Sequence, residues 1–233
     1  MAVIVVTGAS QGMGCAIAEA FAGEAGACIA LVARNEEKLK EVAQACEASG
    51  AETAVFPCDV TDEAQVQQMV AGVTKQWGTP DVLINNAGVF HPGSLVETTL
   101  ASFRYQLDVN LVSAFMVTQG FLKAMLDQGK GTIYYMASVA AMKAYPGGAA
   151  YCTAKHGLLG LARSVREETR ETGIRVTTLL PGATLTPSWD GVDLPEERFM
   201  PATDIAKAVL DIYHMSDRTV VEEVVLRPQK GDI

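Results

Sequence analysis

"VIVVTGASQGMG", residues 3 to 14, leads from a run of β-branched residues into a turn with three glycines, and the helical pattern "CAIAEAFAGEAG" follows directly. A strand, a glycine turn and a helix in this order form the first unit of a dinucleotide-binding sheet, where the glycines let the backbone approach a pyrophosphate. The helix N-terminus adds amide donors and a dipole that favours negative charge. The spacing is GxxxGxG rather than the commoner GxGxxG, and such glycines also mark ordinary strand-to-helix turns. The residues predicted to contact a cofactor here are Gly8, Ser10, Gln11, Gly12, Met13 and Gly14.

Short β-rich runs and longer helical patterns alternate along the rest of the chain. Apolar residues recur at intervals of three and four positions in segments such as "EEKLKEVAQACEAS", which is the period of a helix. Asn35 and Asp62 are suitable N-caps for these helices. Parallel strands need crossovers, which helices supply, and no linker or repeat divides the chain. We therefore predict one α/β domain over residues 1–233, with a doubly wound parallel sheet and helices on both faces. Its seven strands are expected at residues 3–6, 28–33, 53–58, 81–85, 131–137, 175–180 and 221–226.

Composition and charge exclude several classes of protein. The 233 residues are 49% hydrophobic and 19% charged, as a sheet buried on both faces requires, and the net charge of −9 disfavours nucleic acid and anionic membranes. The N-terminus lacks the pattern of a signal peptide, and no stretch is expected to be long and apolar enough to span a bilayer. Five cysteines without CxxC spacing favour reduced thiols, and so a cytoplasmic protein.

The ends of the second, third and fourth strands carry further candidates for cofactor binding. An acid at the end of the second strand would bind the ribose 2′-hydroxyl of NAD, but "VARNEEK" places Arg34 there. A guanidinium suits a 2′-phosphate, so NADP is preferred, although Arg34 is alternatively a solvated loop residue. Ligands sit at the carboxyl ends of strands in open sheets, and "CDVTD" and "NNAG" end the next two. The candidates from these two stretches are Asp59, Val60, Asn86, Ala87 and Gly88, with the alternative that they only form turns.

A serine, a tyrosine and a lysine follow the fifth strand. Tyr151 and Lys155 are four residues apart, so a helix places them on one face, and Ser138 lies thirteen residues before Tyr151 at the end of the strand. The two hydroxyls can reach one carbonyl oxygen. A tyrosine has an unperturbed pKa of about 10, which must fall for ready proton exchange near neutrality. A nearby ammonium, helped by the positive charge of an oxidised nicotinamide, acts in that direction.

Other uses of these residue types find less support. The three histidines, His91, His156 and His214, have no paired acid, and the GxSxG turn of a serine hydrolase is absent. No cluster of histidine, cysteine and carboxylate has zinc-ligand spacing, so no metal site is predicted. Cys152 adjoins Tyr151, but a helical neighbour at i+1 points elsewhere.

The combination of motifs resembles the short-chain dehydrogenase/reductase family over essentially the whole chain. The family pattern TGxxxGxG matches residues 7–14, NNAG matches residues 85–88, and PGxxxT matches residues 181–186. The helix asparagine, the serine and the YxxxK pair of the family match Asn110, Ser138, Tyr151 and Lys155. The resemblance implies a Rossmann-type sheet, hydride transfer between NADP(H) and a carbonyl carbon, and a homodimer or homotetramer formed through the helices that bear Asn110 and Tyr151.

The resemblance also assigns roles to these residues. Tyr151 is the general acid in reduction, Ser138 orients the carbonyl, and Asn110 holds a water in the proton relay. Lys155 lowers the phenol pKa and binds the nicotinamide ribose. The further cofactor contacts that it implies are Tyr151, Lys155, Pro181, Gly182, Thr184 and Thr186.

The substrate is less well indicated by the sequence. Residues 183–204 are expected to form a lid, in which Trp189 is a candidate wall for a planar or apolar substrate or else packs the closed loop. "TPSW" and the C-terminal stretch resemble bacterial members called sepiapterin reductases and broad carbonyl reductases, which favours a pterin side chain or a diketone. Two alternatives remain, a 3-oxoacyl-[acyl-carrier-protein] reductase and a non-catalytic NADP-sensing protein. The first needs a basic patch at the lid, where only Arg198 is basic, and the second would not need the intact catalytic residues.

Overall fold

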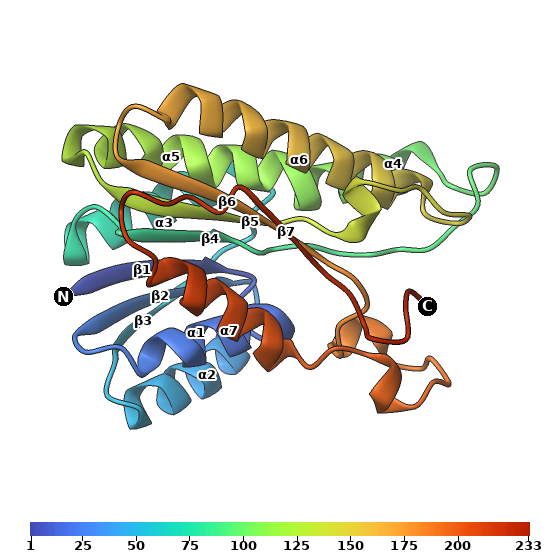
Figure 1. Ribbon diagram of the computed structural model, residues 1–233, viewed down its shortest axis with the longest axis horizontal. Coiled ribbons are helices and arrows are strands. Elements are labelled where there is room, and N and C mark those ends of the chain that lie inside the picture. The colour runs from blue at the N-terminus through green and yellow to red at the C-terminus, as the bar shows by residue number, and fades with distance from the viewer.

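Seven parallel strands in one sheet form the centre of the computed structural model, which describes residues 1–233. Their order is β3-β2-β1-β4-β5-β6-β7, so the connections run outward in opposite directions from β1 and β4 (Figure 1). Val6 of β1 pairs with Leu31 on one side and Ile84 on the other. The predicted parallel sheet is confirmed, and its ligand-binding edge lies where β1 and β4 diverge. The strands are β1 Ala2–Thr7, β2 Ala27–Ala33, β3 Glu52–Pro57, β4 Val82–Asn85, β5 Gly131–Met136, β6 Ile174–Pro181 and β7 Glu223–Leu226.

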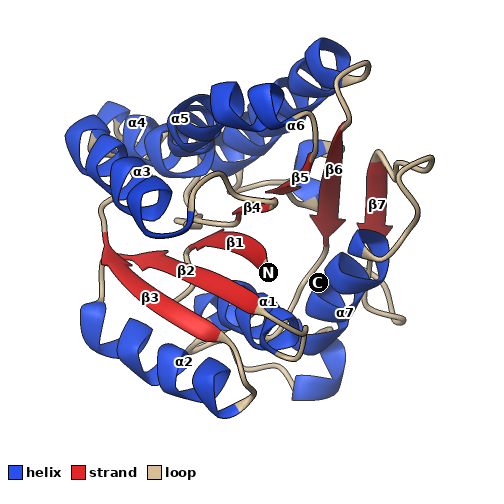
Figure 2. Cartoon of the chain, turned by 90° about the vertical axis from the view of Figure 1, so that its left-hand side faces the viewer, coloured by secondary structure: helices blue, strands red, loops and turns tan.

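Two helical layers cover the two faces of the sheet (Figure 2). Alternate residues of a strand point to opposite faces, so Val3 and Val5 of β1 join one core cluster while Ile4 and Val6 join the other. The first cluster lies under α3, α5 and α6, and the second under α1, α2 and α7. The helices are α1 Gly12–Ala22, α2 Glu36–Ala48, α3 Glu63–Trp77, α4 Leu100–Leu107, α5 Ser113–Gln128, α6 Ala149–Thr169 and α7 Ala202–Tyr213.

The predicted N-caps hold the starts of α2 and α3. The Asn35 side chain accepts a hydrogen bond from the Lys38 amide at 3.0 Å, and Asp62 accepts one from the Gln65 amide at 3.1 Å. Each bond satisfies a backbone donor that has no partner within the helix. Both helices therefore begin directly beside the loops that end β2 and β3.

The expectation that no stretch could span a bilayer is wrong on length and composition. Leu100–Gln128 is a 29-residue helical segment that contains an 18-residue window with a mean hydropathy of 1.3. It consists of α4, a π-helical turn, η1, at Asp108–Val112, and α5. Its side chains Val117, Phe121 and Met125 are buried in the same core as β4 and β5. The high hydropathy therefore belongs to a helix that packs one face on the sheet, which a hydropathy window does not distinguish from a membrane helix.

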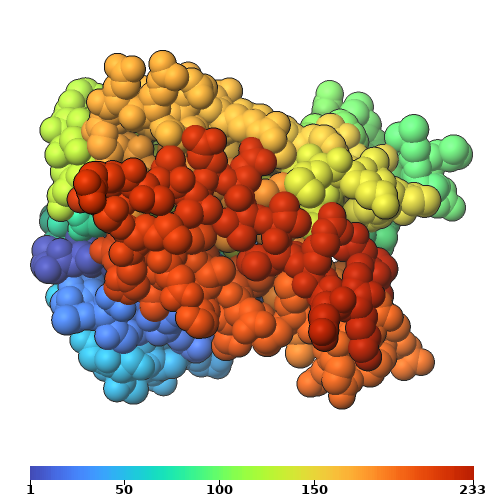
Figure 3. All heavy atoms as spheres, in the orientation of Figure 1, coloured from blue at the N-terminus to red at the C-terminus, as the bar shows by residue number.

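Two arms project at the carboxyl edge of the sheet. In Figure 3 they stand apart at the right, the upper one formed by the loops after β4 and β5 (green and yellow) and the lower one by the segment after β6 (orange) together with the C-terminal tail (dark red). Within the lower arm, Leu185 donates to the Met200 carbonyl at 2.8 Å and the Met200 amide donates to Ala183 at 3.0 Å. These bonds tie the two ends of the predicted lid together.

Candidate active site

The glycine turn between β1 and α1 is built by close backbone contacts. Gly8 and Gly12 have φ values of +67° and +59°, in the left-handed region that side chains other than glycine's disfavour. A Cβ on Gly14 would lie 2.3 Å from the Gly8 carbonyl oxygen, so α1 packs directly on the turn. The Asn86 side chain donates to the carbonyl oxygens of Thr7 and Gly8 at 3.0 and 3.3 Å. The neighbouring strand end therefore holds the turn in its shape.

A cavity of about 440 Å³ opens in front of this turn. Twelve of the residues predicted to contact a cofactor line it: Gly8, Ser10, Gln11, Gly12, Met13, Arg34, Asp59, Val60, Asn86, Ala87, Gly88 and Thr186. The other predicted contacts lie outside its wall. Gly14 packs behind the turn, and the Gly182 amide donates to Leu226 at 2.7 Å while the Thr184 hydroxyl donates to the Gly182 carbonyl at 3.1 Å. Pro181, Gly182 and Thr184 thus form the base of the lid beside β7.

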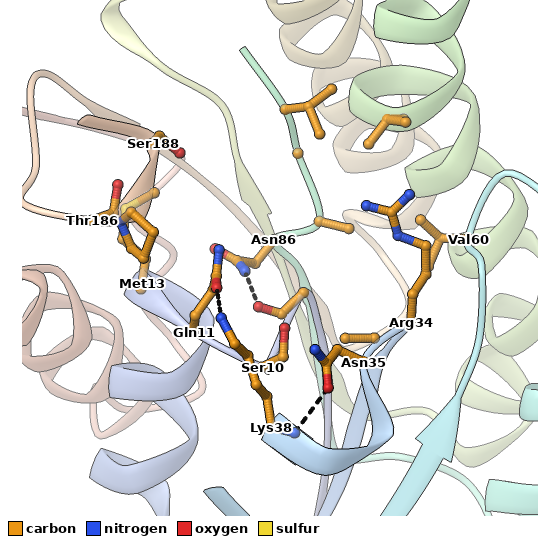
Figure 4. Close-up of a pocket in the computed structure, with 18 of the residues that line it drawn as sticks. Ser10, Gln11, Met13, Arg34, Asn35, Lys38, Val60, Asn86, Thr186 and Ser188 are labelled. Atoms are coloured by element: carbon orange, nitrogen blue, oxygen red, sulfur yellow. Dashed lines mark hydrogen bonds between the residues drawn. The ribbon is translucent and has the colours of Figure 1, made fainter. Parts of the chain in front are cut away.

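Two cations face the cavity without an acidic partner. Arg34 donates only to the Tyr105 hydroxyl, at 3.4 Å, and the Lys38 ammonium donates to the Gln11 side chain at 2.8 Å. In Figure 4 these two side chains lie on either side of Asn35. The sequence analysis missed Lys38, because it looked for a single residue at the end of β2. The signal was present, since Lys38 follows Arg34 by four positions in "RNEEK" and lies in the first turn of α2.

Asp59 lines the cavity and also stabilises its own turn. Its carboxylate accepts hydrogen bonds from the Thr61 amide at 3.0 Å and the Thr61 hydroxyl at 2.7 Å. One carboxylate oxygen is therefore engaged locally. A carboxylate has about four acceptor positions, so Asp59 retains capacity for a donor in the cavity.

The four residues of the predicted catalytic set converge at the ends of β4 and β5. Lys155 donates from Nζ to the Met136 carbonyl at 2.8 Å and lies 5.6 Å from the centre of the Tyr151 ring. A Cβ placed on Gly88 would lie 2.8 Å from the Asn110 Oδ1 atom and 3.5 Å from Lys155 Nζ. Ser138 caps the short helical turn after β5, with its hydroxyl accepting from the Ala140 amide at 3.1 Å. The predicted cluster is present in space.

Burial controls the pKa values of the tyrosine and the lysine. It raises the pKa of Tyr151 to about 12, against which a hydrogen bond with Ser138 acts. Burial also lowers the pKa of Lys155 to about 7. In the chain alone desolvation dominates both pKa values, because burial disfavours both charged forms, and the lowering of the phenol pKa by Lys155 stays a prediction.

Asn110 lies in the π-helical turn, a kind of irregularity that is frequent at functional sites. Its Nδ2 atom donates to the carbonyl oxygens of Val89 and Gln106, both at 2.9 Å, and its Oδ1 atom accepts from the Val89 amide at 3.2 Å. Both amide donors are used. A water in the predicted relay would therefore have to donate to an oxygen of Asn110.

The aromatic side chains near the phenol differ from the one that the sequence suggested. Trp189 packs on Phe199 with ring centres 5.0 Å apart, and it is absent from the cavity wall. Phe90 meets the Tyr151 ring edge-on at 5.1 Å and Tyr145 at 6.4 Å. Single aromatic residues in loops carry no periodic signal, so sequence reasoning missed Phe90 and Tyr145. The role of Trp189 as a substrate wall stays a prediction.

The geometry fits a dinucleotide. The glycine turn presents backbone without side chains to the cavity, the cavity is open along the ends of β1, β2 and β4, and its two unpaired cations suit a phosphate. The phenol and ammonium groups stand at one end of the same edge. The arrangement can therefore hold a nicotinamide cofactor beside a proton donor.

Comparisons with known proteins agree with this geometry. The family model described as short chain dehydrogenase matches residues 2–196. The sepiapterin reductase of Chlorobaculum tepidum is 37% identical, over 99% of this chain and 98% of its own. The alcohol dehydrogenase of the archaeon Thermococcus sibiricus, solved with 5-hydroxy-NADP, superimposes with a TM-score of 0.91 at 29% identity, covering 98% of this chain and 97% of its own. A metagenomic short-chain oxidoreductase solved with NADP gives a TM-score of 0.87 at 33% identity, with coverages of 98% and 97%.

Proposed function

Because the chain belongs to the short-chain dehydrogenase family, we propose that it is an NADPH-dependent reductase of a ketone or aldehyde carbonyl. The observation that carries the proposal is the convergence of Ser138, Tyr151 and Lys155 beside Gly88, which lines a cavity with two unpaired cations. The intact set argues against a protein that only senses NADP. We place it in the cytoplasm, which suits its five free cysteines.

Each side chain of the proposed site has a separate role in the reduction. NADPH, when bound, supplies the hydride. Tyr151 gives its phenolic proton to the carbonyl oxygen, and the Ser138 hydroxyl donates a hydrogen bond to the same oxygen. Lys155 is anchored on the Met136 carbonyl at 2.8 Å and keeps further N–H donors for a ribose hydroxyl. Asn110 holds the segment after β4 in place through Val89.

We propose a pterin side-chain carbonyl or a diketone as the substrate. The similarity to a sepiapterin reductase supports this class, as do the Phe90 and Tyr145 rings beside the phenol, which suit a planar group. We expect NADPH oxidation to be faster with sepiapterin or a diketone than with an acetoacetyl thioester. A panel of carbonyl compounds at equal concentration, followed at 340 nm, measures the ranking. The reverse ranking would favour a 3-oxoacyl-[acyl-carrier-protein] reductase.

Arg34 and Lys38 are proposed to bind the 2′-phosphate of NADPH. Arg34→Ala should raise the KM for NADPH roughly 10- to 100-fold, the range for losing charge-assisted hydrogen bonds, and leave the KM for NADH almost unchanged. Lys38→Ala should act in the same direction. Initial rates with both cofactors test this, with Lys40→Ala as the control because Lys40 already pairs with Glu36. An equal rise in KM for NADPH and NADH would show that these side chains do not recognise the 2′-phosphate.

We also propose a homodimer or homotetramer formed through α5 and α6. α5 exposes Phe115 and Leu126 to 46% and 38%. Both residues line a surface pocket together with Leu161 of α6, and an apolar patch that spans two helices is typical of a surface that another subunit covers. The predicted association through the helices bearing Asn110 and Tyr151 is compatible with this face.

A further inference from the structure

Two side-chain amides on one helical segment pair with the backbone that follows β4. Gln106 accepts from the His91 amide and donates to the His91 carbonyl, both at 3.1 Å. Asn110 makes the same pair of bonds with Val89, at 3.2 and 2.9 Å. Both side chains are 1% exposed. We name this pair of residues, with its four hydrogen bonds, the amide ladder.

The spacing of the amide ladder follows from regular geometry. Residues four apart on a helix rise by about 6 Å. Alternate residues of an extended chain are separated by about 6.7 Å, so two such amides can meet residues 89 and 91 in turn. The order is antiparallel, since the later helix residue meets the earlier backbone residue. The ladder thus satisfies four backbone groups that would otherwise lack partners after the sheet ends.

The backbone that the amide ladder holds, residues 89–91, lies beside both the Tyr151 phenol and the cofactor cavity. Phe90 lies between the two rungs, and its ring packs edge-on against Tyr151 at 5.1 Å. The His91 ring stacks on Tyr105 at 5.6 Å, and the Tyr105 hydroxyl accepts from Arg34 at 3.4 Å. Residues 89–91 also line the cofactor cavity. A shift of this backbone would therefore move the wall of the phenol and the wall of the cavity together.

We propose that Gln106 is a positioning residue for the reaction, acting through the amide ladder to hold Phe90 against Tyr151. This rests on the proposed function for its kinetic part. Asn110 belongs to the proposed catalytic set, so a substitution of Asn110 could not distinguish an effect on positioning from an effect on the reaction itself. The Gln106 side chain hydrogen-bonds only to the His91 backbone, so its substitution removes no hydrogen bond to Tyr151 or Lys155.

Gln106→Met tests the proposal because methionine keeps the length of the side chain and removes its hydrogen bonds. We expect kcat to fall roughly 10-fold, since small displacements at a reacting centre have effects of this size or larger, and the KM for NADPH to change much less. Hydrogen exchange of the His91 amide should rise at least about 10-fold, because its acceptor is lost. Gln68→Met is the matched control, since Gln68 is exposed on α3 and should change neither quantity. If Gln106→Met does not fold, Gln106→Asn, one methylene shorter, replaces it with the same expectations.

A double-mutant cycle distinguishes positioning from general stability. If Gln106 acts through Phe90, the loss in kcat from Gln106→Met should disappear in a Phe90→Ala background. If the two substitutions instead lower kcat independently, so that their factors multiply in the double variant, the proposal is overturned. Faster amide exchange at His91 with an unchanged kcat would also overturn it. Unchanged exchange at His91 would show that the amide ladder does not hold this segment. If the natural chain reduces no carbonyl, the proposed function fails, whereas the exchange measurement still decides whether the ladder exists.

Discussion

Tyr151→Phe should lower kcat roughly 10²- to 10⁴-fold, the range in which a positioned proton donor contributes, and leave NADPH binding nearly unchanged. The substitution removes only the phenolic oxygen and keeps the ring, so the edge-on contact with Phe90 remains. Single-turnover hydride transfer separates the reaction from product release, and NADPH fluorescence measures binding. Tyr213→Phe is the matched control, because Tyr213 packs on Phe21 on the other face of the sheet. Retained activity in Tyr151→Phe would refute the proposed acid.

The pH dependence of the natural enzyme gives a second test of Tyr151 as the acid, because reduction and oxidation should respond to pH in opposite directions. A phenol whose pKa burial raises to about 12 stays protonated at neutral pH, so the acid needed for reduction is present there. Reduction should be lost only as the pH rises through the phenol pKa of the cofactor complex. Oxidation of the alcohol needs the deprotonated form and should become faster over the same interval. The two opposite profiles, both absent in Tyr151→Phe, are measured as kcat against pH in each direction.

Gly14→Ala should have the second large effect, because it forces α1 away from the glycine turn. Its Cβ would stand 2.3 Å from the Gly8 carbonyl oxygen and 2.5 Å from the Asn86 Nδ2 atom. One of these partners is backbone and cannot rotate away. We expect a loss of about 1–3 kcal/mol in the free energy of unfolding, the range for overpacking a close contact, together with weaker NADPH binding. Denaturant unfolding and a fluorescence titration measure the two effects.

Gly160→Ala is the control for Gly14→Ala. Gly160 lies in α6 with nothing within 4 Å of the added Cβ, so alanine should stabilise the helix by roughly 0.4–1 kcal/mol and leave NADPH binding unchanged. A Gly14→Ala protein as stable as the natural chain would show that the turn and α1 relax freely. In that case the close packing behind the turn would not be needed to shape the cofactor site.

Much of the site was predictable because its signals are local in sequence. The glycine turn, NNAG and the YxxxK pair each lie within a few residues, and parallel strands bring their carboxyl ends to one edge. Phe90 and Gln106 were missed for the opposite reason. Gln106 hydrogen-bonds to backbone 15 residues away, and Phe90 contacts a ring 61 residues away. Such pairs have no periodicity that a single sequence displays.

The amino-acid sequence by itself indicated the seven parallel strands, the glycine turn before α1 and the four candidate catalytic residues, because strand and helix periods and short motifs depend only on near neighbours. Tertiary structure decided the rest. It packed one face of Leu100–Gln128 on the sheet and placed Trp189 against Phe199. It also buried Tyr151 and Lys155, so that desolvation raises the pKa of the phenol and lowers the pKa of the ammonium, which favours the neutral form of each. Burial and through-space contact depend on how distant elements pack, so they emerge only when the crossovers have assembled the sheet.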